Sequence, residues 1–144
     1  GKTIAVAIKD RGAVLPGGHT ANAAYWFDGG DVGKWITSSY YMDELPSWVN
    51  DFNASGKVQS YKKAWTTLKN IDSYKESGPD DNNYEGLFEG ETSPTFPHST
   101  TGILDKTKDF GLISGTPYGN SLTTDFALEA LDSFLSSKTF ASAW

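Results

Sequence analysis

A short apolar run near the amino terminus, Thr3-Ile4-Ala5-Val6-Ala7-Ile8, constrains the fold more than any other feature of this sequence. Unbroken apolar runs of this length are typical of strands buried on both faces, as in the parallel sheets of α/β domains. The run ends in Lys9-Asp10-Arg11-Gly12, which places charged residues at the carboxyl edge of the sheet. Open α/β sheets bind their ligands at that edge. Gly12 and the following Leu15-Pro16-Gly17-Gly18 predict an irregular loop after the strand.

The two cations that follow the strand are the first candidate site. Side chains two positions apart point the same way in extended backbone, so we expect Lys9 and Arg11 to converge on one anion. Arginine offers a planar fork to phosphate oxygens, and lysine offers a mobile point charge. Asp10 is expected to point the other way and to orient the turn. A solvated strand end is the commoner explanation of an isolated Lys-x-Arg, so the pair alone leaves both interpretations open.

A β-hairpin and a helix are predicted next. The sequence predicts two strands, Ala23-Phe27 and Lys34-Tyr41, which are joined by the turn residues Asp28-Gly29-Gly30-Asp31. Asp43 is a plausible N-cap for a helix with Pro46 in its first turn. The helix would end near Asn53 and Gly56, and its apolar stripe is formed by Leu45, Trp48, Val49 and Phe52.

The second half of the chain mixes helices with long loops. The spacing of Val58, Tyr61, Trp65 and Leu68 favours a second helix over Val58-Leu68. The residues from Asp72 to Pro97 have no apolar period and predict a loop. We expect a short strand at Asp109-Ser114 and a loop at Gly115-Asn120. A final helix, capped by Ser121 or Thr123, has an apolar stripe formed by Leu122, Phe126, Ala130, Leu131, Phe134 and Leu135.

Length and composition narrow the function classes. The chain has 144 residues, enough for one domain with a core, and a net charge of −6, which argues against a nucleic-acid surface. There are no cysteines, so disulfides and thiolate metal sites are excluded. No stretch has the length and apolarity of a membrane span, and no signal peptide is recognisable. Five Trp, seven Tyr and eight Phe make a sugar-binding module a fair interpretation of composition alone.

Other candidate residues favour structural roles. His19 and His98 are the only histidines and lack the spacing of a zinc site, so we expect them to form hydrogen bonds in loops. Four tryptophans at apolar positions are predicted to be mostly core residues: Trp26, Trp35, Trp48 and Trp65. Asn53-Ala54-Ser55 is interpreted as a chance match to a glycosylation pattern. A solvated loop is predicted for the acidic residues, which lack calcium-loop spacing: Asp80, Asp81, Glu85, Glu89 and Glu91.

The segment Ile8-His19 resembles bacterial alkaline phosphatases of the PafA type, in the alkaline phosphatase superfamily. The resemblance extends to about Leu131 through five further segments: Ala23-Phe27, Tyr41-Val49, Phe88-His98, Thr116-Asn120 and Thr124-Ala127. It implies an α/β fold, part of an alkaline-phosphatase-like domain, with one buried strand followed by a hairpin, two to three helices and long loops. It also implies that Lys9 and Arg11 contact the substrate phosphoryl group opposite two zinc ions, and that the parent is periplasmic or secreted.

Several parts that the family needs are missing from this sequence. The resemblance implies a Thr or Ser nucleophile before the Lys-x-Arg segment and Asp-x-x-x-His and Asp-His ligand pairs after it. Neither ligand pattern occurs in the chain. We therefore expect the central segment of a zinc-dependent phosphomonoesterase, which supplies Lys9 and Arg11 and is inactive and without metal on its own. The alternative is a non-catalytic module that binds carbohydrate or protein through its aromatic residues.

The resemblance also suggests how the chain is organised. Residues 1-20 are expected to form the phosphate-contacting strand and loop, 21-120 an inserted cap-like region, and 121-144 a helix and an atypical tail. The tail from Ser133 onward departs from the family pattern. Few other segments suit a parallel sheet, so we predict that Thr3-Ile8 lies at an exposed sheet edge or packs on another chain. Self-association through that edge is possible, whereas nucleic acid and membrane are not expected partners.

Overall fold

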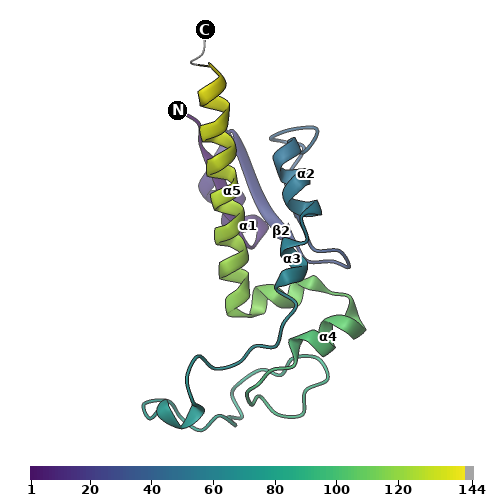
Figure 1. Ribbon diagram of the computed structural model, residues 1–144, viewed down its shortest axis with the longest axis vertical. Helices are drawn as coiled ribbons and strands as arrows, with labels where there is room; N and C mark the ends of the chain where they lie inside the picture. Colours follow the sequence, from purple (N-terminus) through teal and green to yellow (C-terminus); the bar gives the residue numbers. More distant parts are fainter. Residues whose placement is uncertain (142–144) are drawn as a thin grey trace. The chain divides into compact units, whose positions relative to one another are not determined.

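The computed structural model describes residues 1–141, with side chains through residue 135 (Figure 1). It divides into two compact units, each described by itself below. The first unit contains Gly1–Tyr61 together with the chain from Asp109 onward, and the second contains Lys62–Lys108. No helix among the described residues is both long and apolar enough to cross a membrane.

A three-stranded sheet lies at the centre of the first unit, in the order β1-β2-β3. Strand β1 (Ile4–Ala7) pairs in parallel with β2 (Ala23–Asp28), and β2 pairs antiparallel with β3 (Lys34–Ile36). The α/β class and the hairpin are thus confirmed, but the strand predicted over Lys34-Tyr41 is too long, because β3 ends at Ile36 and residues 39–41 form a turn. Strand β1 lies at an edge of this sheet, as predicted, and its residues are only half-buried because one side of the strand has no partner among the described residues.

The loop predicted after β1 is wrong, because α1 (Asp10–Gly17) begins directly after Lys9. The glycines serve close packing instead of a turn. A Cβ on Gly12 would lie 3.1 Å from the Cβ of Ala7, and one on Gly17 would lie 3.1 Å from the Cβ of Ala5. Their missing side chains let the helix approach the strand closely. Gly18, with φ of 60°, ends the helix, and the short 3₁₀ helix η1 (Gly18–Thr20) leads into β2.

Helices α2 (Ser47–Ala54) and α3 (Lys57–Ser60) follow the hairpin. Val49 and Phe52 are buried as predicted, but the residue before the first helical turn is Pro46, so the N-cap assigned to Asp43 is wrong. Gly56 adopts a left-handed φ of 77° and separates the two helices.

The helix predicted over Val58-Leu68 is also wrong beyond its first turn. Helix α3 ends at Ser60, and Trp65 instead forms an isolated antiparallel bridge with His98. Leu68 is 99% exposed, so the predicted apolar stripe is not continuous. The bridge takes up the Trp65 backbone, which donates to and accepts from His98, and this pairing competes with the helix.

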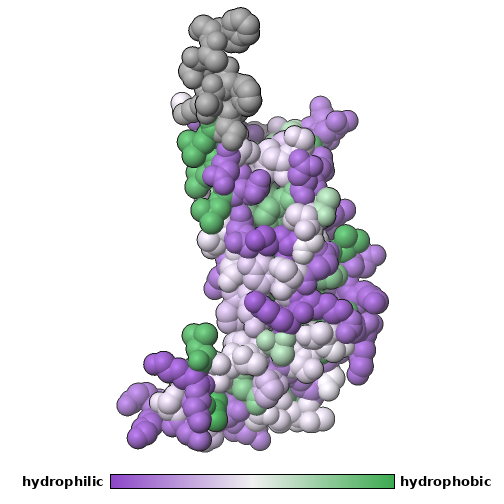
Figure 2. All heavy atoms as spheres, viewed as in Figure 1, coloured by the Kyte–Doolittle hydropathy of each residue, from purple (hydrophilic) through white to green (hydrophobic). Residues whose placement is uncertain are grey.

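Helix α5 (Pro117–Ala141) completes the first unit and begins earlier than Ser121, with Pro117 suited to a first helical position. The loop predicted at Gly115-Asn120 is therefore helical from Pro117 onward. The predicted strand at Asp109-Ser114 is the 3₁₀ helix η3 (Phe110–Gly115). Leu122, Phe126 and Ala130 are buried, but Leu131 and Leu135 are 60% and 63% exposed. Figure 2 shows the hydrophobic surface along this part of α5.

Phe126 is the centre of the core. Its ring stacks on Trp35 with the centroids 4.1 Å apart and an interplanar angle of 11°. Its other ring contacts are with Tyr25, Trp48 and Phe52 at centroid distances of 5.5, 5.2 and 5.2 Å. Aromatic contacts of this kind contribute beyond the burial of area. They join α2 and α5 to one face of the sheet.

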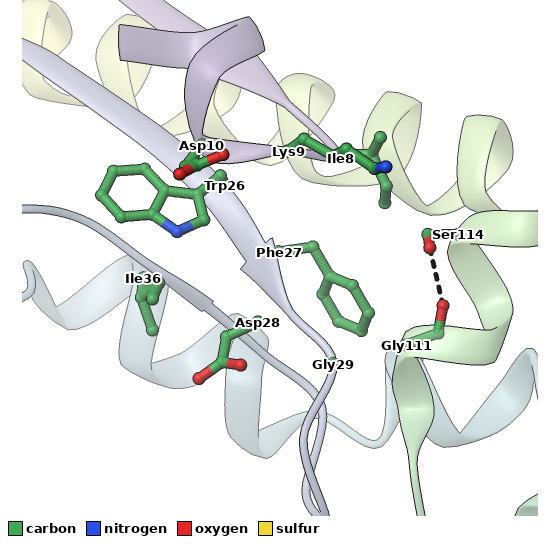
Figure 3. A pocket seen from close by; sticks show the side chains of 10 residues that line it. All are labelled: Ile8, Lys9, Asp10, Trp26, Phe27, Asp28, Gly29, Ile36, Gly111 and Ser114. Carbon is green, nitrogen blue, oxygen red and sulfur yellow. Dashed lines mark hydrogen bonds between the residues drawn. The ribbon is translucent and has the colours of Figure 1, made fainter.

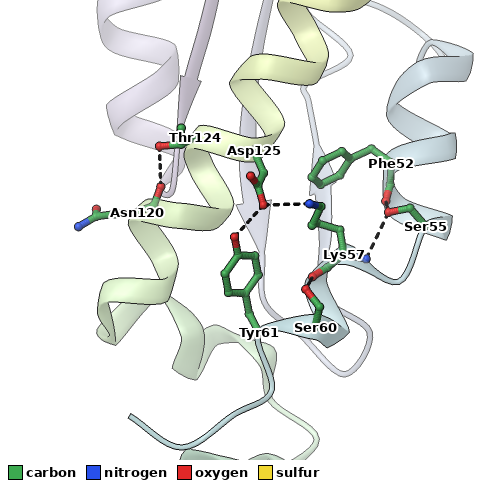
Figure 4. Close-up of polar contacts among 8 residues, drawn as sticks. All are labelled: Phe52, Ser55, Lys57, Ser60, Tyr61, Asn120, Thr124 and Asp125. Carbon is green, nitrogen blue, oxygen red and sulfur yellow. Dashed lines mark hydrogen bonds and ion pairs between the residues drawn. The ribbon is translucent and has the colours of Figure 1, made fainter. Parts of the chain in front are cut away.

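A polar contact fixes α3 to α5 (Figure 4). The Tyr61 hydroxyl donates to Asp125 Oδ2 at 2.7 Å, and Lys57 Nζ lies 3.3 Å from the same oxygen. Burial and the Asp125 carboxylate raise the pKa of Tyr61 to about 12, because both disfavour the phenolate. The Asp125 carboxylate is therefore paired with both the Tyr61 hydroxyl and the Lys57 ammonium group.

The second unit contains little regular structure. Its elements are the 3₁₀ helix η2 (Ile71–Ser73) and helix α4 (Thr100–Thr107), so the loop predicted up to Pro97 is largely confirmed. His98 is buried, shares a 2.9 Å hydrogen bond with Glu91, and is enclosed by Trp65, Phe88 and Phe96. This aromatic cluster is the interior of the unit.

Candidate functional site

A cavity of about 440 Å³ lies over the carboxyl ends of β1 and β2 (Figure 3). We call it the sheet-edge cavity; its lining residues are Ile8, Lys9, Asp10, Trp26, Phe27, Asp28, Gly29, Ile36, Gly111 and Ser114. Its volume is in the range of small-molecule sites. Its position is the one predicted from the charged residues at the end of the first strand.

Lys9 lies at the junction between strand and helix. Its backbone is extended, with φ of −122° and ψ of 147°, and it immediately precedes the first turn of α1. Its side chain is exposed and lines the cavity. Among the described residues no ion pair holds its ammonium group, which leaves it available to an anion.

Arg11 lies in the first turn of α1 and is exposed. Lys9 and Arg11 were expected to point the same way because both were assumed to have extended backbone. That assumption is wrong for Arg11, which is helical. Arg11 is also not among the residues that line the cavity. Both cations lie at the same end of the sheet. Lys9 follows the end of β1, and Arg11 belongs to the first turn of α1.

Asp10 was expected to orient a turn, but it lies at the start of a helix and bonds to that helix's first turn. Its Oδ1 accepts a hydrogen bond of 2.7 Å from the backbone N–H of Arg11. A carboxylate in the first turn of a helix interacts favourably with the helix dipole.

Trp26 and Asp28 are the lining residues that sequence reasoning missed. Trp26 was predicted to be core, but it is half-buried and lines the cavity. Asp28 was assigned only to the turn, yet it is the exposed last residue of β2. The missed signal is their spacing: residues two apart on β2 share a face, so a tryptophan and a carboxylate stand on one side at the end of the strand.

The other three tryptophans of the described residues are packed against other side chains. Trp35 is fully buried, and Trp48 packs on Tyr25 and Phe126. Trp65 lies against Phe96 and His98 in the second unit. Trp35, Trp48 and Trp65 therefore belong to interiors, and they form no exposed stacking surface for a sugar.

The two histidines take part in local hydrogen bonds. His19 Nδ1 lies 2.9 Å from the Tyr40 hydroxyl in the first unit, and His98 Nδ1 lies 2.9 Å from Glu91 Oε1 in the second. Over the described part of the chain, no three His, Asp or Glu side chains come together in a group that can hold a metal ion. The donor set present in these residues therefore does not fit a zinc centre.

Asp81, Glu85 and Glu89 are exposed, as predicted for a solvated acidic loop, whereas Asp80 and Glu91 make hydrogen bonds. Asp80 accepts a hydrogen bond from the Phe96 backbone, and Glu91 accepts from the Phe88 backbone and His98. The Asn53 amide accepts from the backbone N–H of Trp35 at 2.8 Å and donates to its carbonyl at 2.9 Å. Asn53 thus pairs with β3 as a neighbouring strand would.

Comparisons with known proteins agree on one relationship. No family model matches the chain. It is 46% identical over 131 residues to alkaline phosphatase PhoV of Synechococcus elongatus and 44% identical over 136 residues to alkaline phosphatase PafA of Elizabethkingia meningoseptica. These alignments cover 90% and 91% of this chain but 23% and 24% of the relatives. A protein of Myroides odoratus named calcium-transporting ATPase is 54% identical over 132 residues, which are 91% of this chain and 24% of that protein.

Solved structures give the same result for the fold. The crystal structure of wild-type PafA matches with a TM-score of 0.82 and 44% identity, over 91% of this chain and 25% of that one. A PafA variant with four substitutions matches with a TM-score of 0.82 and 42% identity. In sequence and in fold the chain matches one segment of the PafA-type alkaline phosphatases, and it spans about a quarter of the length of the relatives it matches.

Proposed function

We propose that this chain is the phosphate-contacting segment of a zinc-dependent phosphomonoesterase. The observation that carries the proposal is the position of Lys9, an exposed cation in the sheet-edge cavity at the start of α1. Arg11 in the first helical turn adds a planar fork for phosphate oxygens. A phosphate monoester carries more charge than a diester, so two cations favour the monoester.

The relatives support this assignment. Two of them are named alkaline phosphatases. The solved PafA variant replaces a lysine and an arginine two positions apart by alanine, an asparagine by alanine and a threonine by serine. Lys9 and Arg11 have the same spacing in this chain. We assign them as the phosphoryl contacts on this basis and on their place beside the cavity.

Catalysis in this proposal depends on groups supplied by the longer protein. Residues of the longer protein would hold two zinc ions and provide a hydroxyl nucleophile, and the metal ions would supply charge stabilisation for the attacking and leaving oxygens. The segment contributes binding and charge stabilisation through Lys9 and Arg11. By resemblance, we propose a periplasmic or secreted location and a phosphate monoester as the substrate, with the open edge of β1 available to a further strand.

The test compares the segment with the longer protein. We expect the 144-residue chain alone to bind no zinc tightly and to hydrolyse p-nitrophenyl phosphate at the background rate. The longer protein should contain zinc and lose most of its activity on replacement of Lys9 by Ala. Stoichiometric zinc with chelator-sensitive turnover in the isolated chain would overturn the division of labour proposed here.

The name of the Myroides relative provides a second arm for the same experiment. If the protein that contains this segment is a calcium-transporting ATPase, as that relative is named, it should hydrolyse ATP faster than simple monoesters and depend on Ca²⁺. A phosphomonoesterase should hydrolyse p-nitrophenyl phosphate without Ca²⁺ and depend on zinc. The ratio of the ATP hydrolysis rate to the p-nitrophenyl phosphate hydrolysis rate distinguishes an ATPase from a phosphomonoesterase.

A further inference from the structure

The sheet-edge cavity has two chemically different ends. Figure 3 shows Asp10 and Trp26 together on one side of β2, with Asp28 and Ile36 on the same side, and the Lys9 ammonium on the other side near Ser114. One end of the cavity therefore presents a cation, and the other presents an indole and two carboxylates.

This second end suits an organic cation. Trp is the strongest aromatic partner of a quaternary ammonium group, and carboxylates add charge attraction. Asp28 is exposed and takes part in no ion pair among the described residues, although Lys34 is its partner across the hairpin. Asp10 uses one carboxylate oxygen for the Arg11 backbone. A second anion such as a further phosphate would be repelled from this end.

We propose that the cavity selects phosphate monoesters whose leaving group carries a positive charge, that is, aminoalkyl phosphates. Lys9 takes the phosphoryl group, and Trp26 with Asp28 takes the ammonium group. This inference rests on the function proposed above and adds the substrate class. The cavity volume of about 440 Å³ accommodates a small zwitterion of this kind.

Two esters of the same shape test the charge preference. Phosphocholine carries a trimethylammonium group, and 3,3-dimethylbutyl phosphate replaces its nitrogen by carbon. Binding to the chain is measured by NMR from the Trp26 indole N–H resonance. Phosphocholine should bind about tenfold more tightly than 3,3-dimethylbutyl phosphate, whose alkyl group carries no charge. Asp28→Asn, which keeps the shape of an exposed side chain, should reduce that preference to twofold or less.

The controls separate this inference from the proposed function. Lys9→Ala should weaken both esters and inorganic phosphate alike. Trp26→Phe, followed through the backbone amides at the start of α1 because the indole is absent, should weaken only phosphocholine. Equal binding of the two esters to the wild-type chain, with Lys9 still required, would overturn the charge preference and keep the phosphate site. If Asp28→Asn strengthens both esters equally, Asp28 pairs with Lys9 and the inference is wrong. If no phosphate compound perturbs Lys9 or Trp26, both proposals fail.

Discussion

The sheet-edge cavity and the contact between α3 and α5 use similar side chains in opposite ways. At the contact, Lys57, Tyr61 and Asp125 satisfy one another within 2.7 to 3.3 Å. At the cavity, Lys9 and Asp28 are exposed and take part in no ion pair within the described part of the chain. Charges that satisfy one another stabilise the fold, whereas charges held apart at the end of a sheet are available to a ligand.

The largest effect is expected at Arg11. In the longer enzyme, Arg11→Ala should lower kcat/KM for a phosphate monoester by roughly 10²–10³, as for the loss of one strong transition-state donor. Arg11→Lys should not restore the rate, because the planar fork is lost. The measurement is steady-state kinetics with p-nitrophenyl phosphate.

Two controls sharpen the test of Arg11. Diester turnover should fall much less than monoester turnover. Lys57→Ala should leave the monoester kcat/KM nearly unchanged, because Lys57 is already paired with Asp125. Equal losses on both ester classes would mean that Arg11 supports the fold and does not read phosphate charge.

A smaller effect, on stability, is expected at Asn53. Its side chain makes two hydrogen bonds to the Trp35 backbone, so Asn53→Ala should lower the free energy of unfolding by about 1–3 kcal/mol. Asn50 is a matched control, because its side chain makes one exposed hydrogen bond to the Leu45 carbonyl. Urea denaturation of both variants measures the difference. Equal losses would show that Asn53 is not a substitute for a strand.

The smallest effect is expected at Tyr61. Removing its hydroxyl in Tyr61→Phe should cost about 0.5–1.5 kcal/mol of unfolding free energy at neutral pH. The exposed Tyr40, whose hydroxyl lies 2.9 Å from His19, provides the control variant Tyr40→Phe. If Tyr61→Phe lowers the free energy of unfolding no more than Tyr40→Phe does, the contact does not fix α3 to α5.

The same contact predicts a pH dependence. The folded pKa of Tyr61 is raised to about 12, above the usual value of 10.0, so the folded state holds its proton more tightly than the unfolded state. This contribution is fully present below pH 10 and is lost as the pH rises toward 12. Tyr25, whose pKa is also raised to about 12 by burial, adds to the loss. Tyr61→Phe should therefore lose less stability than wild type between pH 10 and 12.

The sequence predicted the periodic elements better than the packed junctions. The first strand follows from its unbroken apolar run and the hairpin from its turn residues. The buried residues Val49, Phe52 and Phe126 follow from helical spacing. The helix over Asp10–Gly17 was missed because its glycines look like turn residues, whereas they are needed for contact with Ala5 and Ala7. Local composition does not reveal such a contact between two elements.

The site was predicted in part for the same reason. Lys9 was found because a charge directly after a buried strand marks the carboxyl end of a sheet. Trp26 was missed because an aromatic residue on a strand usually belongs to the core, and only the three-dimensional position of α1 and η3 shows that this one lines a cavity. The geometry expected for Arg11 was wrong because the backbone turns helical at Asp10.

The most direct test of the account is a titration of the chain with inorganic phosphate, followed by NMR. The account predicts that phosphate shifts the Lys9 side chain and the backbone amides at the start of α1, and leaves Lys57 unchanged. Lys9→Ala should abolish the response of these amides. Shifts of equal size at Lys9 and Lys57, or a response that survives Lys9→Ala, would contradict the claim that the strand end is the phosphate site.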